Sequence, residues 1–122
     1  MKSILVIDDN RDIRENTAEI LELAGYKTFT AENGKLGVDL AIRENAWGLA
    51  RYARSVQESG FVPIIEPEIL MDGDHSIEYC AKVTTHVLSN VYHELLRHKV
   101  DIDCTLLKPN MVIFLILSRK RR

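Results

Sequence analysis

Short apolar runs alternate with longer helical stretches along this chain, and that order limits the folds it can adopt. Apolar and β-branched side chains cluster in four runs, which we expect to be strands: residues 3–7, 27–31, 62–66 and 105–108. Between these runs, apolar residues recur at the 3.6-residue spacing of helices with one buried face. Strands that alternate with helices are typical of parallel sheets with right-handed crossovers. We therefore predict a single α/β domain over residues 1–122, a length that can bury one core.

The longest helical stretch covers about residues 35–59 and contains no proline. Its apolar positions keep one phase throughout, and they are Val38, Ala41, Ile42, Ala46, Leu49, Ala50, Ala53 and Val56. A helix of this length is about 37 Å long at about 1.5 Å per residue, which is long for a small domain. We predict one continuous helix, and a break or bend near Gly48 is the alternative.

The number of strands decides between an open sheet and a closed barrel. A (β/α) barrel takes eight strands, and this chain offers four, or five if residues 111–117 form another. We therefore predict an open parallel sheet with flanking helices, a flavodoxin-like three-layer sandwich. In that plan the first run lies between the second and the third, and the fourth lies beyond the third.

Four ionisable residues stand at the carboxyl ends of the predicted strands. Asp8 and Asp9 follow the first run, Glu66 ends the third, and Lys108 ends the fourth. Ligands of open α/β sheets bind outside these strand ends, so we expect the four groups to share one crevice and to shift each other's pKa values. The alternative is an ion pair between the lysine and a carboxylate, without any activity.

Composition argues against several classes of partner. A net charge of −2 gives no electrostatic basis for binding nucleic acid. Cys80 and Cys104 lack the spacing of a metal or redox motif, which favours free thiols. The apolar run at residues 111–117 is far shorter than the roughly 20 residues of a bilayer span. The N-terminal segment turns polar at Asp8, too early for a secretory signal. We expect a cytoplasmic protein that binds neither nucleic acid nor membrane.

The motif ILVIDDN at residues 4–10 places two carboxylates directly after a predicted strand. Over about residues 1–44 the sequence resembles the receiver domain of bacterial response regulators. That resemblance implies a Mg²⁺ site at Asp8 and Asp9, because Mg²⁺ prefers carboxylate and water oxygens. It also puts Glu66 near the place of the phosphoacceptor aspartate of that family. The alternative is that Asp9 caps the first helix while Asp8 is solvated.

Three motifs in the rest of the chain are highly specific: EPEIL at residues 66–70, DGDH at 72–75 and LLKPNM at 106–111. Over about residues 40–112 the sequence resembles an internal stretch of class I fructose-bisphosphate aldolase, which is built from TIM-barrel βα units. Beyond that stretch the sequence departs from the family pattern. This leaves residues 113–122 as an unmatched apolar and basic tail.

The aldolase resemblance implies roles for three residues. Lys108 would form the Schiff base with a ketose, Glu66 would assist proton transfer, and Glu68 would support the lysine electrostatically. The amine must be deprotonated before it attacks a carbonyl, and a carboxyl must then move protons during dehydration. A neighbouring glutamate raises the pKa of a lysine, so burial would have to outweigh that effect. The family draws further catalytic residues from earlier strands and phosphate-binding residues from later ones.

The two resemblances lead us to interpret the chain as an engineered or recombined chimera, joined within residues 39–45. We expect no complete native activity, with Lys108 and the pair Asp8 and Asp9 as vestigial groups. Two alternatives stay open: aldolase-like Schiff-base formation at Lys108, and a phosphorelay module that binds Mg²⁺. The expected partners are a phosphorylated sugar or a small phosphodonor, and no cofactor beyond Mg²⁺ is expected. Self-association through residues 111–117 is a further expectation.

Overall fold

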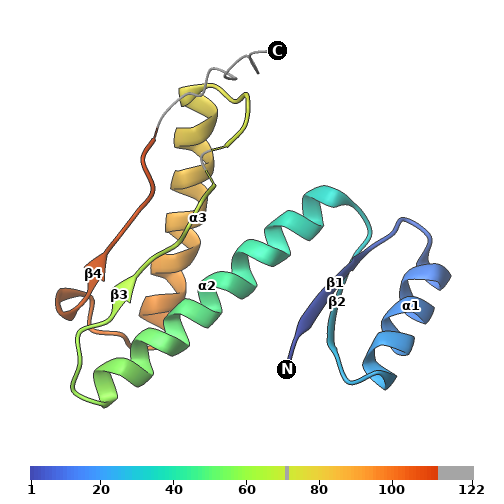
Figure 1. The fold of residues 1–122 in the computed structure, drawn as a ribbon, viewed down its shortest axis with the longest axis horizontal. Helices are drawn as coiled ribbons and strands as arrows, with labels where there is room; N and C mark the ends of the chain where they lie inside the picture. Colours follow the sequence, from blue (N-terminus) through green and yellow to red (C-terminus); the bar gives the residue numbers. More distant parts are fainter. Residues whose placement is uncertain (71, 113–122) are drawn as a thin grey trace, which may run out of the picture. The chain divides into compact units, whose positions relative to one another are not determined.

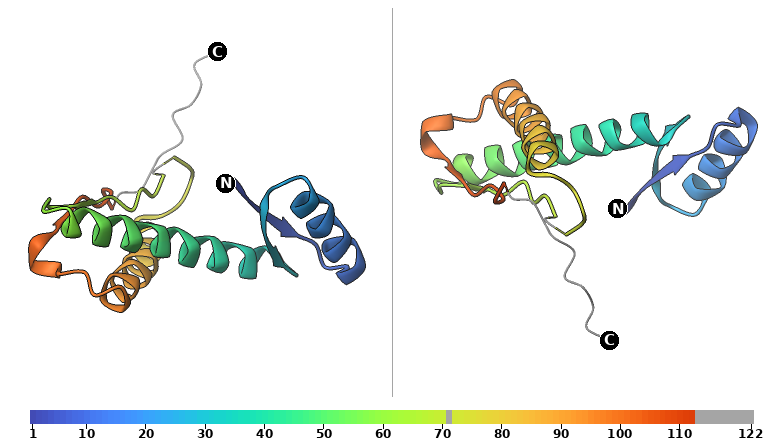
Figure 2. Two further views of the ribbon diagram at one scale, coloured as in Figure 1. Left: turned by 90° about the horizontal axis from the view of Figure 1, so that it is seen from below. Right: turned by 90° about the horizontal axis from the view of Figure 1, so that it is seen from above.

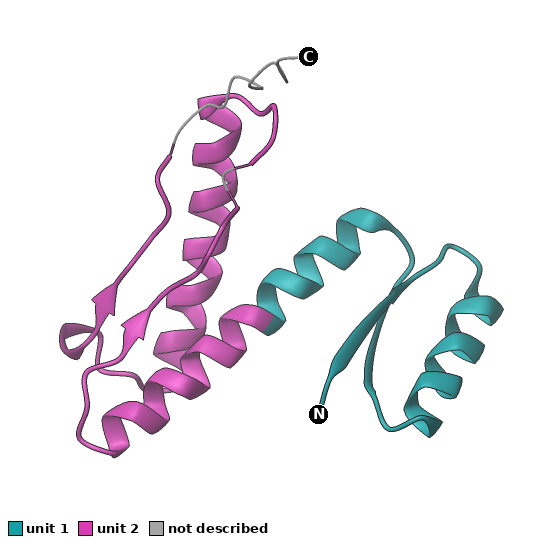
Figure 3. Cartoon of the chain, viewed as in Figure 1, with its two compact units in different colours: residues 1–44 teal, residues 45–122 magenta. Residues whose placement is uncertain are grey.

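The computed structural model describes residues 1–70 and 72–112. Contacts between residues divide the chain into two compact units, which Figure 3 shows in different colours. Unit 1 is Met1–Glu44 and unit 2 is Asn45–Arg122. The single α/β domain over residues 1–122 stays a prediction.

Unit 1 begins with two parallel strands, β1 (Ser3–Ile7) and β2 (Lys27–Ala31), joined by the helix α1 (Arg11–Leu23) (Figure 1). The two strands pair residue for residue along their full length. Asn10 caps α1, because its side-chain oxygen accepts the Ile13 N–H at 3.1 Å. Both strands predicted in this part of the chain are confirmed with the expected bounds.

One helix, α2 (Gly34–Glu58), is 25 residues long and passes from unit 1 into unit 2. Asn33 precedes it, and its side-chain oxygen accepts a backbone N–H of the first turn at 2.9 Å. Gly37 lets this turn approach β1, because a Cβ there would lie 2.5 Å from Cδ1 of Ile7. The continuous helix is confirmed, and the alternative break near Gly48 is wrong.

Unit 2 contains a second pair of parallel strands, β3 (Ile64–Ile65) and β4 (Leu106–Leu107). The helix α3 (Ile77–Arg97) connects them, and a 3-10 helix, η1 (Ile102–Cys104), precedes β4. Ser76 caps α3 by accepting a backbone N–H of its first turn. The part of α2 that belongs to unit 2 and α3 lie on the same side of the strand pair (Figure 2).

The core of unit 2 lies between α2, α3 and β3. Its buried residues are Ala46, Ala50, Ala53, Ile65, Val91, Leu95 and Val100. The three alanines stand on one face of α2, and small side chains allow a close approach of the packed elements. Three of the eight residues in the apolar stripe predicted on the long helix are therefore buried in this core, and Leu49 packs against it.

The four-stranded sheet predicted from the sequence is not confirmed. The described strands pair as two two-stranded sheets, β1 with β2 and β3 with β4. In addition, β3 and β4 are shorter than the runs predicted at 62–66 and 105–108. Prolines explain their length, because Pro63 and Pro67 bracket β3, Pro109 closely follows β4, and proline has no N–H for the ladder. The chain is a mixed α/β protein with small parallel sheets, and the flavodoxin-like sandwich is not confirmed.

A fifth strand at residues 111–117, and self-association through that strand, were further expectations. Most of this run belongs to residues 113–122, which lie outside the described residues. Met111 and Val112 are described and belong to no strand. In the part of the chain that the structure describes, no helix combines the length and the apolar character needed to cross a membrane.

Candidate functional site

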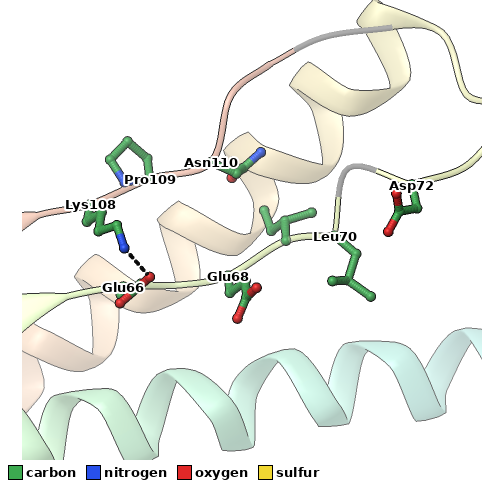
Figure 4. Close-up of a pocket in the computed structure, with 8 residues that line it drawn as sticks. Glu66, Glu68, Leu70, Asp72, Lys108, Pro109 and Asn110 are labelled. Carbon is green, nitrogen blue, oxygen red and sulfur yellow. Dashed lines mark hydrogen bonds and ion pairs between the residues drawn. The ribbon is translucent and has the colours of Figure 1, made fainter. Parts of the chain in front are cut away.

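Lys108 and Glu66 lie next to each other at the carboxyl ends of β4 and β3. The strands pair in parallel with Ile65 opposite Leu107, so the residues that follow occupy adjacent positions. The Lys108 N–H donates to the Ile65 carbonyl at 2.8 Å and extends the ladder by one step. At the end of the side chain, Lys108 Nζ donates to Glu66 Oε1 at 2.7 Å (Figure 4). Strand pairing thus assembles this half of the predicted crevice.

Glu66 favours the charged form of Lys108. Its hydrogen bond and its charge raise the pKa of Lys108 above that of an ordinary lysine, and the charge of Glu68 adds to the rise. Burial lowers this pKa only slightly, since 67% of the Lys108 side chain is exposed. We expected burial to outweigh the effect of the glutamate on this pKa, and in the structure the glutamate has the larger effect.

The two side chains line an open hollow of about 320 Å³ between the segments that follow β3 and β4. The lining residues are Glu66, Glu68, Ile69, Leu70, Asp72, Lys108, Pro109 and Asn110. Figure 4 shows the carboxylates on the segment after β3 and the lysine on the segment after β4. Three carboxylates and one ammonium give this lining a net negative charge at neutral pH. The hollow can admit a small polar molecule and offers it an amine beside a carboxyl group.

Two contacts from the helices hold the segments on either side of β4, and sequence reasoning missed both. Asn110 Nδ2 donates to Oγ1 of Thr84, a buried residue of α3, at 3.2 Å. Gln57 of α2 donates to the carbonyls of Asp101 and Cys104 at 2.8 and 3.2 Å and accepts the Asp101 N–H at 3.0 Å. No local pattern signals these contacts, because the residues they join are 26 to 47 positions apart.

Asp8 and Asp9 lie in unit 1, between β1 and α1. Asp8 Oδ1 accepts the Asn10 N–H at 2.8 Å, and Arg14 donates to the Asp8 carbonyl at 2.6 Å. Asn10 caps α1, so the alternative in which Asp9 caps this helix is wrong. Among the described residues, no three His, Cys, Asp or Glu side chains gather as a metal site. The Mg²⁺ site at Asp8 and Asp9 and the four-residue crevice stay predictions.

Comparison with known proteins relates the sequence to one family. Residues 21–120 match the family model described as fructose-bisphosphate aldolase class-I. The cytosolic fructose-bisphosphate aldolase 4 of Arabidopsis thaliana is 62% identical over 74 residues, and fructose-bisphosphate aldolase B of Homo sapiens is 58% identical over 73 residues. These alignments cover 61% and 60% of the chain but only 19% and 20% of the relatives. The chain therefore spans about a fifth of the length of these curated relatives.

A solved structure gives the same relation. The fructose-bisphosphate aldolase from Plasmodium falciparum, in a ternary crystal structure with TRAP and a small-molecule inhibitor, superposes with a TM-score of 0.64. The sequences are 52% identical, and the match covers 69% of this chain and 24% of that one. The local arrangement of strands and helices in this chain thus resembles part of a larger protein.

These findings overturn the interpretation of the chain as an engineered or recombined chimera without complete native activity. The family match begins at residue 21, inside the segment interpreted as receiver-like, and it continues to residue 120. The relatives and the solved structure give no sign of a receiver domain or of a phosphorelay module. The receiver interpretation depended on a strand followed by two acids, and polar groups at strand ends are common to parallel α/β sheets in general. The match also includes residues 113–120 of the predicted tail, whose interpretation as a separate segment stays a prediction.

Proposed function

The chain belongs to the fructose-bisphosphate aldolase class-I family, and on that premise we propose that Lys108 forms a Schiff base with a carbonyl substrate. The observation that carries the proposal is the 2.7 Å contact between Lys108 Nζ and Glu66 Oε1 at neighbouring strand ends. An amine and a carboxyl group that can exchange a proton are the two groups this chemistry requires. The position of Lys108 within the motif LLKPNM supports the same assignment.

Glu66 acts as the proton carrier in the proposed reaction. Its carboxylate accepts a proton from the Lys108 ammonium, and the neutral amine attacks the carbonyl carbon to form a carbinolamine. The carboxylic acid then returns the proton to the carbinolamine hydroxyl, which leaves as water while the C=N bond forms. The product is a cationic imine with Glu66 ionised again. The negative charge of Glu68 favours that cation.

The raised pKa of Lys108 sets the expected pH dependence. Only the neutral amine attacks a carbonyl, so most of the lysine is unreactive at neutral pH. We expect imine formation at Lys108 to become faster as the pH rises toward the lysine pKa.

The chain spans about a fifth of the length of its relatives, and the reaction that we propose for it is imine formation and not cleavage of a carbon–carbon bond. The substrate class is a small ketose or its phosphate ester. Since a relative at 62% identity is named as cytosolic, we infer that this chain acts in the cytoplasm.

Reductive trapping tests the proposal. The chain is incubated with dihydroxyacetone or its phosphate in the presence of cyanoborohydride, and each lysine-containing peptide is examined by mass spectrometry. We expect the adduct mainly on Lys108, lost in Lys108→Met and kept in Lys82→Met, a control that removes an exposed lysine of α3. Equal labelling of Lys82 and Lys108 with both ketoses would refute the proposal.

A further inference from the structure

The segment that follows Lys108 is attached to α3 through a buried hydroxyl group. Asn110 Nδ2 donates to Thr84 Oγ1 at 3.2 Å, and Thr84 is only 6% exposed. The same amide nitrogen lies 3.1 Å from the Met111 carbonyl, which Cys80 Sγ approaches at 3.9 Å. Cys80 and Thr84 are four residues apart and therefore share one face of α3. That face anchors the chain two residues beyond Lys108.

The anchor lies where the strand pairing ends. The Lys108 N–H donates to the Ile65 carbonyl at 2.8 Å, and Pro109 cannot continue the ladder because it has no N–H. Proline also fixes its own φ and restricts the residue before it to extended conformations, so few backbone torsions separate Lys108 from Asn110. In Figure 4 these two residues lie on either side of Pro109 along one segment. The position of Asn110 therefore limits the direction of the Lys108 side chain.

We infer that Thr84, through its hydrogen bond to Asn110, positions Lys108 for proton exchange with its glutamate partner. The inference rests on the proposed function, because it takes Lys108 as the reacting amine. The ion pair between Lys108 and Glu66 is exposed, with 67% and 50% of the two side chains open to solvent. Water weakens such a pair, so its geometry depends on how the two backbones are held. A displacement of the reacting groups by about 1 Å can lower a rate by about 100-fold.

Replacing the hydroxyl of Thr84 with a methyl group isolates this link. Thr84→Val keeps the branched shape of the side chain and removes the acceptor of the Asn110 amide. Thr84→Ser keeps the hydroxyl and is the conservative variant. Thr85→Val is the matched control, because it makes the same change at the next residue of α3, which is exposed. Asn110→Ala removes the link from the other side without a change in α3.

NMR titration of the Lys108 side chain in the full chain measures the positioning without a substrate. The contact with Glu66 raises the pKa of Lys108, so a less populated contact lowers that pKa toward the ordinary lysine value. We expect the pKa of Lys108 to fall in Thr84→Val and in Asn110→Ala. It should keep the value of the unchanged chain in Thr84→Ser and in Thr85→Val. A substitution that only weakened the packing of α3 would leave this pKa unaltered while the chain is folded.

Reductive trapping of dihydroxyacetone measures the effect on the proposed reaction. The rate of adduct formation at Lys108 is divided by the fraction of neutral amine that the titration gives, so the change in pKa cancels. We expect this corrected rate to fall by about tenfold in Thr84→Val and in Asn110→Ala, because the reacting groups are displaced. The double variant should be no slower than either single one, because both changes remove the same hydrogen bond. Thr84→Ser and Thr85→Val should keep the rate, and labelling of Lys82 should be the same in every variant.

The two measurements separate this inference from the proposed function. A chain that traps no ketose selectively at Lys108 would refute the proposed function, and the titration would still decide the positioning. An unchanged pKa of Lys108 in both Thr84→Val and Asn110→Ala would overturn the inference, and so would equal losses in Thr84→Val and Thr84→Ser. Circular dichroism of each variant should match that of the unchanged chain. If Thr84→Val fails to fold, Asn110→Ala decides the question, because it leaves α3 intact.

Discussion

Replacing Leu95 with alanine tests the core of unit 2 through one side chain. Leu95 is 1% exposed and packs with Val91 of α3 and the alanines of α2. Its truncation removes buried methyl groups and leaves a cavity, and such changes cost about 2–5 kcal/mol. That is a large share of the roughly 5–15 kcal/mol by which native proteins are stable. We expect Leu95→Ala to lower the free energy of unfolding by about 3 kcal/mol.

The neighbouring residue provides the control. Leu96 is 66% exposed because successive residues of a helix point about 100° apart, so Leu96→Ala should change the free energy of unfolding by about 0.5 kcal/mol or less. Urea unfolding is followed by circular dichroism and by the fluorescence of Trp47, whose ring lies edge-on to His98 at 6.2 Å. Equal losses in the two variants, or a larger loss in Leu96→Ala, would refute the packing of α3 against α2.

Three further changes test the site and its supports. Glu66→Gln should lower the pKa of Lys108, because the charged hydrogen-bond acceptor is lost, and NMR titration of the lysine side chain would show no shift if the pair does not exist in solution. The raised pKa of Lys108 stabilises the folded chain fully at pH values below the ordinary lysine pKa. This stabilisation is lost as the pH rises through the raised pKa of the folded chain. The free energies of unfolding of the unchanged chain and of Glu66→Gln should therefore converge at high pH. Gln57→Ala should lower the free energy of unfolding by about 1–2 kcal/mol through its lost bonds to the loop at Asp101, and an unchanged melting temperature would contradict this. Ser76→Ala should cost about 1 kcal/mol by removing the cap of α3, and an unchanged urea midpoint would argue against that cap.

The helices of this chain were more predictable from the sequence than its sheets. An apolar stripe that keeps its phase over 25 residues is a strong local signal, and α2 follows it closely. Strand pairing depends instead on partners far away in the sequence. Short apolar runs predicted a four-stranded sheet, but they contain no information on which edges meet. The prolines at positions 63 and 67 were visible in the sequence and would have predicted a shorter β3.

The contact between Glu66 and Lys108 could be predicted because both residues end parallel strands that pair. The electrostatic balance at Lys108 could not, since it depends on how much of the side chain is exposed. The same holds for Gln57 and Asn110, whose partners lie on distant elements. Polar residues on helices and loops usually face solvent, so their sequence context gave no reason to select these two.

The hydrogen bonds of Gln57 have a consequence for the dynamics of the loop before β4. A loop of a few residues between a helix and a short strand would ordinarily exchange its amide hydrogens rapidly with water. The Asp101 amide is bound by a side chain of α2, so it can exchange only when the loop separates from that helix. The deuterium uptake of this single amide therefore measures how often the loop that leads to Lys108 detaches.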